Sequence, residues 1–189
     1  AVLAASLTAS GTSLPREEFV YRPWRIADSG VTGFFRDDRL SDRIGFEYSK
    51  WHGRDAAADF IAQLEHIAAS TPAGEVPVVS VILDGENAWE YYPYNGYYFL
   101  DDLYASLEGH ASIRTTTCAD VVASGDHRRR LDHLVAGSWV YGNLATWIGS
   151  RDKNTAWDLL CEAKNRFDLV MASGRLSEEE REAASRQLG

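Results

Sequence analysis

Apolar residues recur at helical spacing in two segments of the chain. In residues 53–70, "GRDAAADFIAQLEHIAAS", an apolar stripe includes Phe60, Leu64 and Ile67, while most acidic residues lie off it. This is the pattern of an amphipathic helix. Residues 99–110, "FLDDLYASLEGH", place leucines on one face in the same way and end at a glycine suited to terminate a helix.

Runs of β-branched and aromatic residues alternate with these helices. "VPVVSVIL" is apolar without alternation, which is typical of a strand covered on both faces. "VTGFFRD" and "SIRTTTCADVVA" have the composition of two further strands. We therefore expect neighbouring parallel strands at 31–36, 77–83 and about 112–117, with helices at 54–69 and 100–108 packed on one side.

The remaining segments have weaker patterns. Residues 1–15 are small and polar and predict a loop, and residues 37–51 predict a loop with one helical turn. Large apolar residues at helical intervals predict helices within 131–149 and 154–174. "SEEE" at 177–180 fits a capping box that opens a last polar helix.

Composition and charge limit the classes of partner. The chain has 189 residues, 45% hydrophobic and 25% charged, as in ordinary globular proteins, and a net charge of −9. This charge argues against nucleic acid and against an anionic membrane surface, and it suits a neutral ligand. No segment has the length of a membrane span. Cys118 and Cys161 show no metal-ligand spacing, so we expect two reduced, buried thiols.

The end of the apolar run at 76–83 is the first candidate site. Asp84 and Glu86 follow it directly, and active sites of parallel α/β folds gather at the C-terminal ends of strands. A turn with two solvated carboxylates is the alternative. Seven aromatic rings follow between residues 89 and 99, more than a loop without a ligand needs. Some must belong to the core, and others, Trp89 among them, suit stacking on a sugar.

Two further places hold candidate binding residues. Arg36 and Asp37 end the predicted strand at 31–36, where they could orient a ligand or act on Asp84, or could simply form a surface ion network. Trp139 and Trp147 are eight residues apart and would share approximately one helix side. Trp139 could reach a ligand cleft, with helix packing as the alternative.

Three motifs in order resemble one enzyme family. "FFRDDRLSDRIGFEYSKWHGRDAAADFIAQL", "VILDGENAWEYYPYNGYYFLDDLYASL" and "GSWVYGNLATWIGSRDKNTAWDLL" resemble the later half of the catalytic region of glycoside hydrolase family 57, closest to its amylopullulanase and α-amylase-like members. The resemblance covers roughly residues 20–170. It implies an incomplete (β/α)7 barrel that acts on α-glucans by the retaining mechanism. It assigns the general acid/base to Asp84, and it matches Glu86, Arg36, Asp37 and Trp139 to positions in the family's motif regions.

The chain departs from the family pattern in its first part. A His-Gln-Pro stretch and a strand that bears the nucleophilic glutamate have no counterpart, because Glu17 and Glu18 in "PREEF" end no strand pattern. A retaining enzyme needs two carboxyl groups about 5–5.5 Å apart. The chain starts at Ala1, and its only methionine is Met171. We therefore expect a fragment that lacks the N-terminal half of the catalytic domain, with 1–125 as the later part of the barrel and 126–189 as a helical region packed on it.

These features predict an α-glucan-active glycoside hydrolase or transglycosylase whose isolated chain is inactive. We expect an α-glucan and the missing half of the domain as partners. We expect no nucleic acid, membrane, metal or cofactor, and a cytoplasmic location. The alternative is a catalytically silent carbohydrate-binding or scaffold protein of the same fold. Magnesium ligation by Asp84 and Glu86 for phosphoryl chemistry is a lesser possibility, because no glycine-rich phosphate loop accompanies them.

Overall fold

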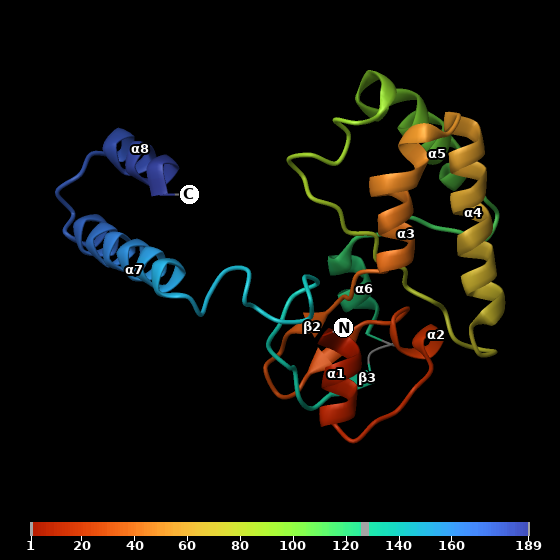
Figure 1. The fold of residues 1–189 in the computed structure, drawn as a ribbon, viewed down its shortest axis with the longest axis horizontal. Coiled ribbons are helices and arrows are strands. Elements are labelled where there is room, and N and C mark those ends of the chain that lie inside the picture. Colours follow the sequence, from red (N-terminus) through yellow and green to blue (C-terminus); the bar gives the residue numbers. More distant parts are fainter. Residues whose placement is uncertain (1, 126–128, 189) are drawn as a thin grey trace. The chain divides into compact units, whose positions relative to one another are not determined.

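The computed structural model describes residues 2–125 and 129–188, which form two compact units. The first unit extends to residue 135, and the second begins at residue 136. Figure 1 labels most of the helices and strands of each unit. The elements of the first unit are α1 (Val2–Ala9), α2 (Arg16–Phe19), β1 (Trp24–Ile26), β2 (Thr32–Gly33), α3 (Asp38–Asp42), the π-helical turn η1 (Arg43–Glu47), the 3-10 turn η2 (Tyr48–Lys50), α4 (Gly53–Ser70), the 3-10 turn η3 (Pro93–Gly96), α5 (Tyr97–Glu108), α6 (Cys118–Ser124) and β3 (Arg129–Leu131). The second unit contains α7 (Arg151–Ala172) and α8 (Glu178–Leu188).

A three-stranded sheet gives the first unit its β content. The strand order is β2-β1-β3, in which Trp24 faces Gly33 across an antiparallel pair and Arg129 across a parallel pair. The described residues thus form a mixed α/β structure, and the (β/α)7 barrel stays a prediction. The predicted boundary after residue 125 adjoins residues 126–128, which lie outside the described ones.

Residues 1–15 contain a helix where the sequence predicted a loop. Leu3 and Leu7 of α1 are four residues apart and are buried with Trp24 and Leu131 in one core cluster. Burial of the two leucines on one helix face explains why this segment is helical despite its small polar residues.

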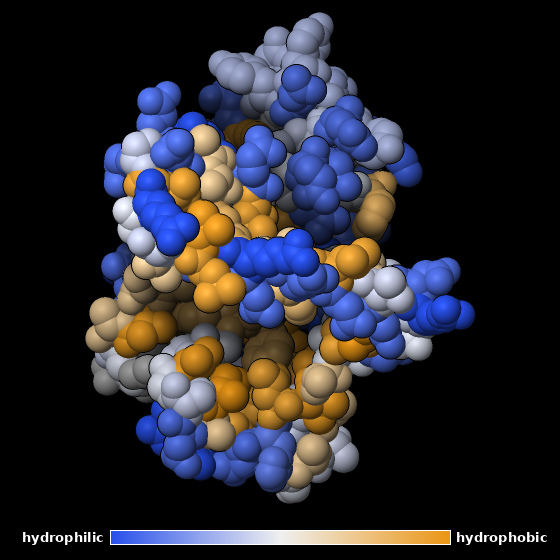
Figure 2. All heavy atoms as spheres, turned by 90° about the vertical axis from the view of Figure 1, so that its left-hand side faces the viewer, coloured by the Kyte–Doolittle hydropathy of each residue, from blue (hydrophilic) through white to orange (hydrophobic). Residues whose placement is uncertain are grey.

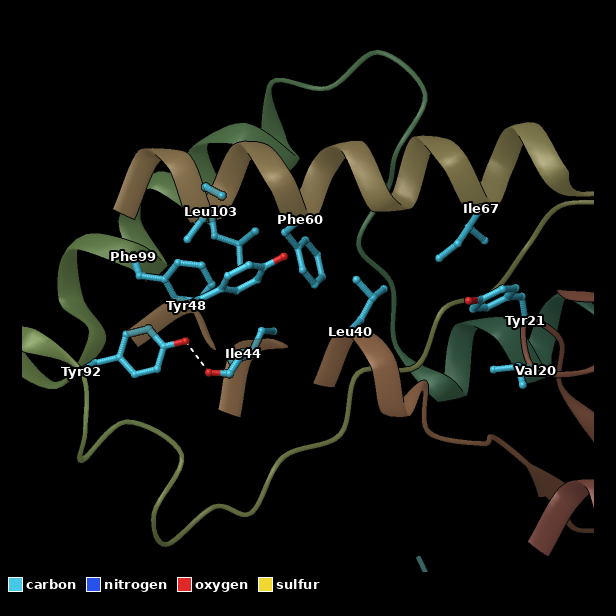
Figure 3. Close-up of a cluster of buried hydrophobic side chains, with 12 residues drawn as sticks. Val20, Tyr21, Leu40, Ile44, Tyr48, Phe60, Ile67, Tyr92, Phe99 and Leu103 are labelled. Atoms are coloured by element: carbon cyan, nitrogen blue, oxygen red, sulfur yellow. Dashed lines mark hydrogen bonds between the residues drawn. The ribbon is translucent and has the colours of Figure 1, made fainter. Parts of the chain in front are cut away.

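The larger core cluster lies between α4 and α5 and extends along α4 (Figure 3). The sequence predicted both helices correctly. Phe60 and Ile67 of α4 and Phe99 and Leu103 of α5 enter the cluster. In Figure 3, Leu40, Ile44 and Tyr48 point into the same cluster from the segment that precedes α4.

That preceding segment, 37–51, was predicted as a loop with one helical turn, and this was wrong. It forms α3, η1 and η2 in succession. Leu40, Ile44 and Tyr48 recur every four residues and are all buried. Because many charged residues lie between them, the overall composition of the segment is polar and does not reveal this narrow apolar stripe.

The predicted strand at 77–83 forms a single rung of sheet. Ser80 makes an isolated parallel bridge with Arg36, so the direction is the predicted one. The strand at 31–36 is reduced to Thr32–Gly33. Asp37 caps α3 immediately after the bridge, so the neighbouring chain turns into a helix and offers no further partner.

The predicted strand at about 112–117 is not formed: this part of the described chain contains no strand, and α6 follows it. The Thr117 hydroxyl accepts a hydrogen bond from the Asp120 backbone N–H at 3.1 Å. This helix cap overrides the β-branched composition of the segment.

The second unit confirms two predicted helices and corrects one. α7 overlaps the predicted helix at 154–174 and begins three residues earlier, and Ser177 and Glu180 form the capping box at the start of α8. Residues 131–149 consist mainly of turns and bends in place of a helix. Gly142 and Gly149 adopt positive φ there, as does Tyr141 at 54°, which interrupts the helical pattern.

Hydrophobic residues also reach the surface, where Figure 2 shows orange patches among blue ones on the face presented. Cys118 and Cys161 are exposed free thiols, so the expected burial was wrong. Both lie on helices, α6 and α7, that bury no residue. Among the described helices, none is long and apolar enough to cross a bilayer.

Candidate functional site

The segment that leads to Asp84 is fastened to the start of α3. The Asp37 backbone N–H donates to the Ser80 carbonyl at 2.8 Å. The Ile82 N–H donates to the Ser41 hydroxyl oxygen at 3.2 Å. Two separate hydrogen bonds therefore fix the chain just before Asp84.

Arg36 adds a third attachment through its side chain. Its Nε donates to the Ile82 carbonyl at 2.9 Å, and its Nη2 lies 2.7 Å from an Asp42 carboxylate oxygen. The guanidinium thus joins α3 to the backbone two residues before Asp84. Sequence reasoning placed Arg36 near Asp84, and the geometry gives it the means to position this segment.

Asp84 and Glu86 are both exposed, and residues 85–90 form turns. Within the described chain, no hydrogen bond or ion pair engages either carboxylate. Both groups are consequently available to a ligand, although neither lines the two cavities described below.

The rings that follow divide into two groups. Trp89 lies edge-on to Tyr92, with ring centroids 5.4 Å apart, and Tyr92 and Phe99 are buried in the larger core. The Tyr92 hydroxyl donates to the Ile44 carbonyl, as the dashed line in Figure 3 shows. Burial raises the pKa of Tyr92 to about 12. These contacts favour a structural role for Tyr92, while stacking of Trp89 on substrate stays a prediction.

A glycine makes room for the Trp89 ring. Gly96 has φ of 79°, and a Cβ added there would lie 3.1 Å from a Trp89 ring carbon. Tyr94 and Asn95 before it also adopt positive φ. This tight turn brings the chain from the exposed loop back into α5.

Asp37 is fully buried and acts first as a helix cap. Its Oδ1 accepts from the backbone N–H groups of Arg39, at 2.9 Å, and Leu40, and Arg16 lies 3.4 Å away. Its Oδ2 is buried without a hydrogen-bond partner among the described residues. Burial, and then the neighbouring Asp37 carboxylate, raises the pKa of the Tyr21 hydroxyl above its ordinary range.

A cavity of about 470 Å³ adjoins this buried carboxylate. Tyr21, Asp37, Arg39 and His66 are among its lining residues. Arg36 thus contacts Ile82 and Asp42, whereas the adjacent Asp37 lines this cavity. The predicted binding role of Asp37 stays a prediction.

Sequence reasoning missed a hydrogen-bond network that joins η1 and η2 to α4. The Asp59 carboxylate accepts from the Tyr48 hydroxyl at 2.6 Å and from Arg43 at 2.7 Å. Burial, together with the hydrogen bond to Asp59, raises the pKa of Tyr48. The stripe Leu40-Ile44-Tyr48 was the available signal, since a helix there turns Tyr48 toward α4.

Trp139 belongs to the second unit. It is exposed and meets Trp147 edge-on, with ring centroids 6.0 Å apart, inside a segment of turns. The two rings do contact each other, but through a turn and not along the predicted helix. Across the described residues, no group of three or more His, Cys, Asp or Glu side chains could hold a metal.

The comparison with known proteins agrees with the motifs. A family model described as glycosyl hydrolase family 57 matches residues 9–132, which is more than half of the chain. The match includes Arg36, Asp37, Asp84, Glu86 and Trp89, and it ends before Trp139. No curated protein gives a significant match.

Proposed function

Since the chain belongs to glycosyl hydrolase family 57, a family of glycoside-cleaving and glycoside-transferring enzymes, we propose that it supplies the general acid/base of a retaining enzyme that acts on α-glucans. Asp84 is that group. The observation that supports the proposal is an exposed, unpaired carboxylate inside the matched region, two residues after Ile82, whose backbone is held by Arg36 and Ser41.

The chemistry follows from what a glycosidic bond needs. Asp84 gives its proton to the glycosidic oxygen as the bond to the anomeric carbon breaks, while a second carboxylate attacks that carbon. Asp84 then takes a proton from water, or from an acceptor sugar, which displaces the second carboxylate. We assign that nucleophile to a part of the (β/α)7 barrel outside this chain, because no glutamate here matches the family's nucleophile position.

Arg36 and Ser41 are positioning residues in this proposal. Both hold Ile82, and neither pairs with the Asp84 carboxylate. Glu86, Trp89, Asp37 and Trp139 are proposed substrate contacts, with Trp89 limited to the part of its ring outside the core.

The test is turnover of an active preparation that contains this chain, with Asp84→Asn against Asp158→Asn. Asp158 lies exposed on α7 and makes no ion pair with any other described residue. Asp84→Asn should lower kcat on maltooligosaccharides about 10²–10⁴-fold, the usual contribution of general acid/base catalysis. Asp158→Asn should keep full activity.

Azide separates the acid/base from a merely structural group. It attacks the anomeric carbon of the glycosyl-enzyme without needing a base, so the Asp84→Asn variant should regain turnover of an aryl maltoside and release a glycosyl azide of retained configuration. Unchanged turnover in Asp84→Asn, with or without azide, would refute the assignment. The chain alone should release no reducing sugar from starch, and release would require a nucleophile within it.

One observation favours a second function. Asp84 lines neither described cavity, whereas an aromatic cavity lies elsewhere in the first unit. A catalytically silent carbohydrate-binding protein of the same fold would show glucan binding and no Asp84-dependent turnover.

A further inference from the structure

We propose that the cavity between the N-terminal ends of α4 and α5 is a second carbohydrate site, which holds an α-glucan chain apart from Asp84. The cavity has a volume of about 580 Å³, within the range of roughly 300–1,000 Å³ that small-molecule sites occupy. The choice of α-glucan rests on the proposed function. The site itself rests on the side chains that line it.

Its floor is rigid and aromatic. Tyr48, Tyr92 and Phe99 line it, and all three belong to the larger core cluster. Phe99 packs between the other two, with ring centroids 5.8 Å from Tyr48 and 5.4 Å from Tyr92 (Figure 3). A floor that is already packed loses little conformational freedom when a ligand binds.

Two half-exposed rings form the walls. Trp51 is 43% exposed and Tyr98 is 57% exposed, and both line the cavity. Trp51 meets Tyr48 through a tilted edge contact at 5.4 Å, which leaves ring surface toward solvent. Large exposed rings around a hollow usually mark a ligand or partner, and the C–H-rich face of a glucose ring is a flat apolar match for them.

Polar groups complete the rim. His52, Arg54, Asp101 and Asp102 all line the cavity. Arg54 and Asp102 lie 3.7 Å apart, too far for a hydrogen bond, and no hydrogen bond within the described chain uses the Asp101 carboxylate. His52 Nδ1 accepts from the Arg54 backbone N–H at 3.3 Å, and Arg54 and Asp102 form an ion pair. The Asp101 carboxylate and the remaining side-chain atoms of the ion pair are therefore the groups left for sugar hydroxyls.

The balance of charge favours a neutral ligand over an anion. Arg54 and the two helix N-termini are positive, and Asp101 and Asp102 offset them. A phosphate or carboxylate would meet the two aspartates, whereas a neutral polyol can use both signs.

Gly53 sets the distance between the two helices. A Cβ there would lie 2.9 Å from an Asp102 carboxylate oxygen and 3.2 Å from the Tyr98 carbonyl. Glycine is needed at the first position of α4 for this close approach, which brings the Trp51 and Tyr98 walls to the same cavity.

The test measures binding of maltoheptaose by calorimetry to the full chain in an Asp84→Asn background, which removes turnover. Trp51→Ala and Tyr98→Ala should each weaken binding about threefold to tenfold, the range for one aromatic contact. Tyr104→Ala is the matched control, because Tyr104 is also on α5 and 56% exposed but does not line the cavity. It should bind as the parent does. Asp101→Asn, which keeps the shape of the side chain, should weaken binding without any loss of folding.

Hydroxyl-radical footprinting gives an independent measure. Maltoheptaose should protect Tyr98 and leave Tyr104 unprotected. Equal affinity in the parent, Trp51→Ala and Tyr98→Ala would overturn the cavity site, as would equal protection of both tyrosines. If this occurs while Asp84→Asn still abolishes turnover, the proposed function stands without the second site. If Asp84→Asn keeps turnover while the cavity variants lose binding, the second site stands and the acid/base assignment falls.

Discussion

The two units use similar helices in different ways. α4 buries Ala56, Ala57, Phe60 and Ile67, whereas α7, although longer, buries no residue. Both helices have an apolar stripe, so the pattern alone does not decide burial. The difference shows that helical periodicity predicts a helix, while burial depends on partner elements from elsewhere in the chain.

In the second unit, the ion pairs on α7 are local, between residues one helical turn apart. On α7, Lys164 pairs with Asp168 and Arg166 with Glu162, each four residues apart. Such exposed pairs contribute about 0.3–0.5 kcal/mol each, far less than a buried leucine. We therefore expect large stability effects in residues 2–135 and small ones in residues 136–188.

The sharpest test is a matched leucine truncation. Leu103→Ala on α5 removes a side chain that is 7% exposed, and Leu169→Ala on α7 removes one that is 73% exposed. Leu103→Ala should lower the free energy of unfolding by about 2–5 kcal/mol through lost burial and a cavity. Leu169→Ala should change it by about 0.5 kcal/mol or less. Urea unfolding monitored by circular dichroism measures both, and a large loss for Leu169→Ala would break the comparison.

A smaller loss should follow removal of the buried cap Asp37. Asp37→Ala strands the N–H groups of Arg39 and Leu40 and leaves Arg16 without its buried partner. We expect a loss of about 2 kcal/mol in the free energy of unfolding. Asp38→Ala is the control, because Asp38 also pairs with Arg16 but is exposed. Equal losses from the two substitutions would show that burial of Asp37 contributes nothing.

Alkaline pH should weaken the first unit through its buried tyrosines. Burial raises the pKa of Tyr92 to about 12 from an ordinary value of 10.0, so the folded chain keeps a proton that the unfolded chain releases. The stabilisation is fully present below about pH 10 and is lost as the pH rises toward 12. Tyr92→Phe should flatten this part of the stability curve, with a residual slope from Tyr21 and Tyr48, whose pKa values are also raised. Tyr141→Phe in the second unit should leave the curve unchanged, and an identical slope in Tyr92→Phe would contradict the assignment.

The sequence predicted those helices whose information is local. The helix predicted at 54–69 is α4, which is one residue longer at each end; its stripe is wide and His52 caps it. The helices α1 and α3 were missed because their stripes contain two or three residues each, and burial by distant partners makes them helical. For residues 77–83 the predicted parallel direction was correct, but the predicted strand was too long. Only one bridge forms, because Asp37 begins a helix immediately after it.

For the candidate site, sequence reasoning identified the residues but not their attachments. It grouped Arg36 with Asp84, and the structure connects Arg36 to Ile82. It could not show that Tyr92 turns into the core, because the ring count in residues 89–99 does not distinguish inward from outward rings. That distinction depends on Gly96, whose positive φ turns the chain back toward α5.

The smallest expected effect concerns the cap of α8, and it tests whether this cap stabilises α8 without affecting the first unit. The Ser177 N–H donates to the Glu180 carboxylate at 2.8 Å, and the Glu180 N–H returns a hydrogen bond to the Ser177 hydroxyl. The bond from the Ser177 backbone N–H, and then the bond that the Ser177 hydroxyl donates to the same carboxylate at 3.0 Å, lower the pKa of Glu180. The cap is therefore fully present above the ordinary pKa of 4.5 and is lost as the pH falls through the lowered one. Ser177→Ala should cost about 1 kcal/mol of helix stability. Because α8 buries no residue, the loss should appear as faster hydrogen exchange in α8 alone, with urea unfolding of residues 2–135 unchanged.

Ser185→Ala, at an exposed serine inside α8, should slow exchange slightly because alanine is the better helix former. A shift of the whole unfolding curve by Ser177→Ala would mean that α8 unfolds together with the first unit.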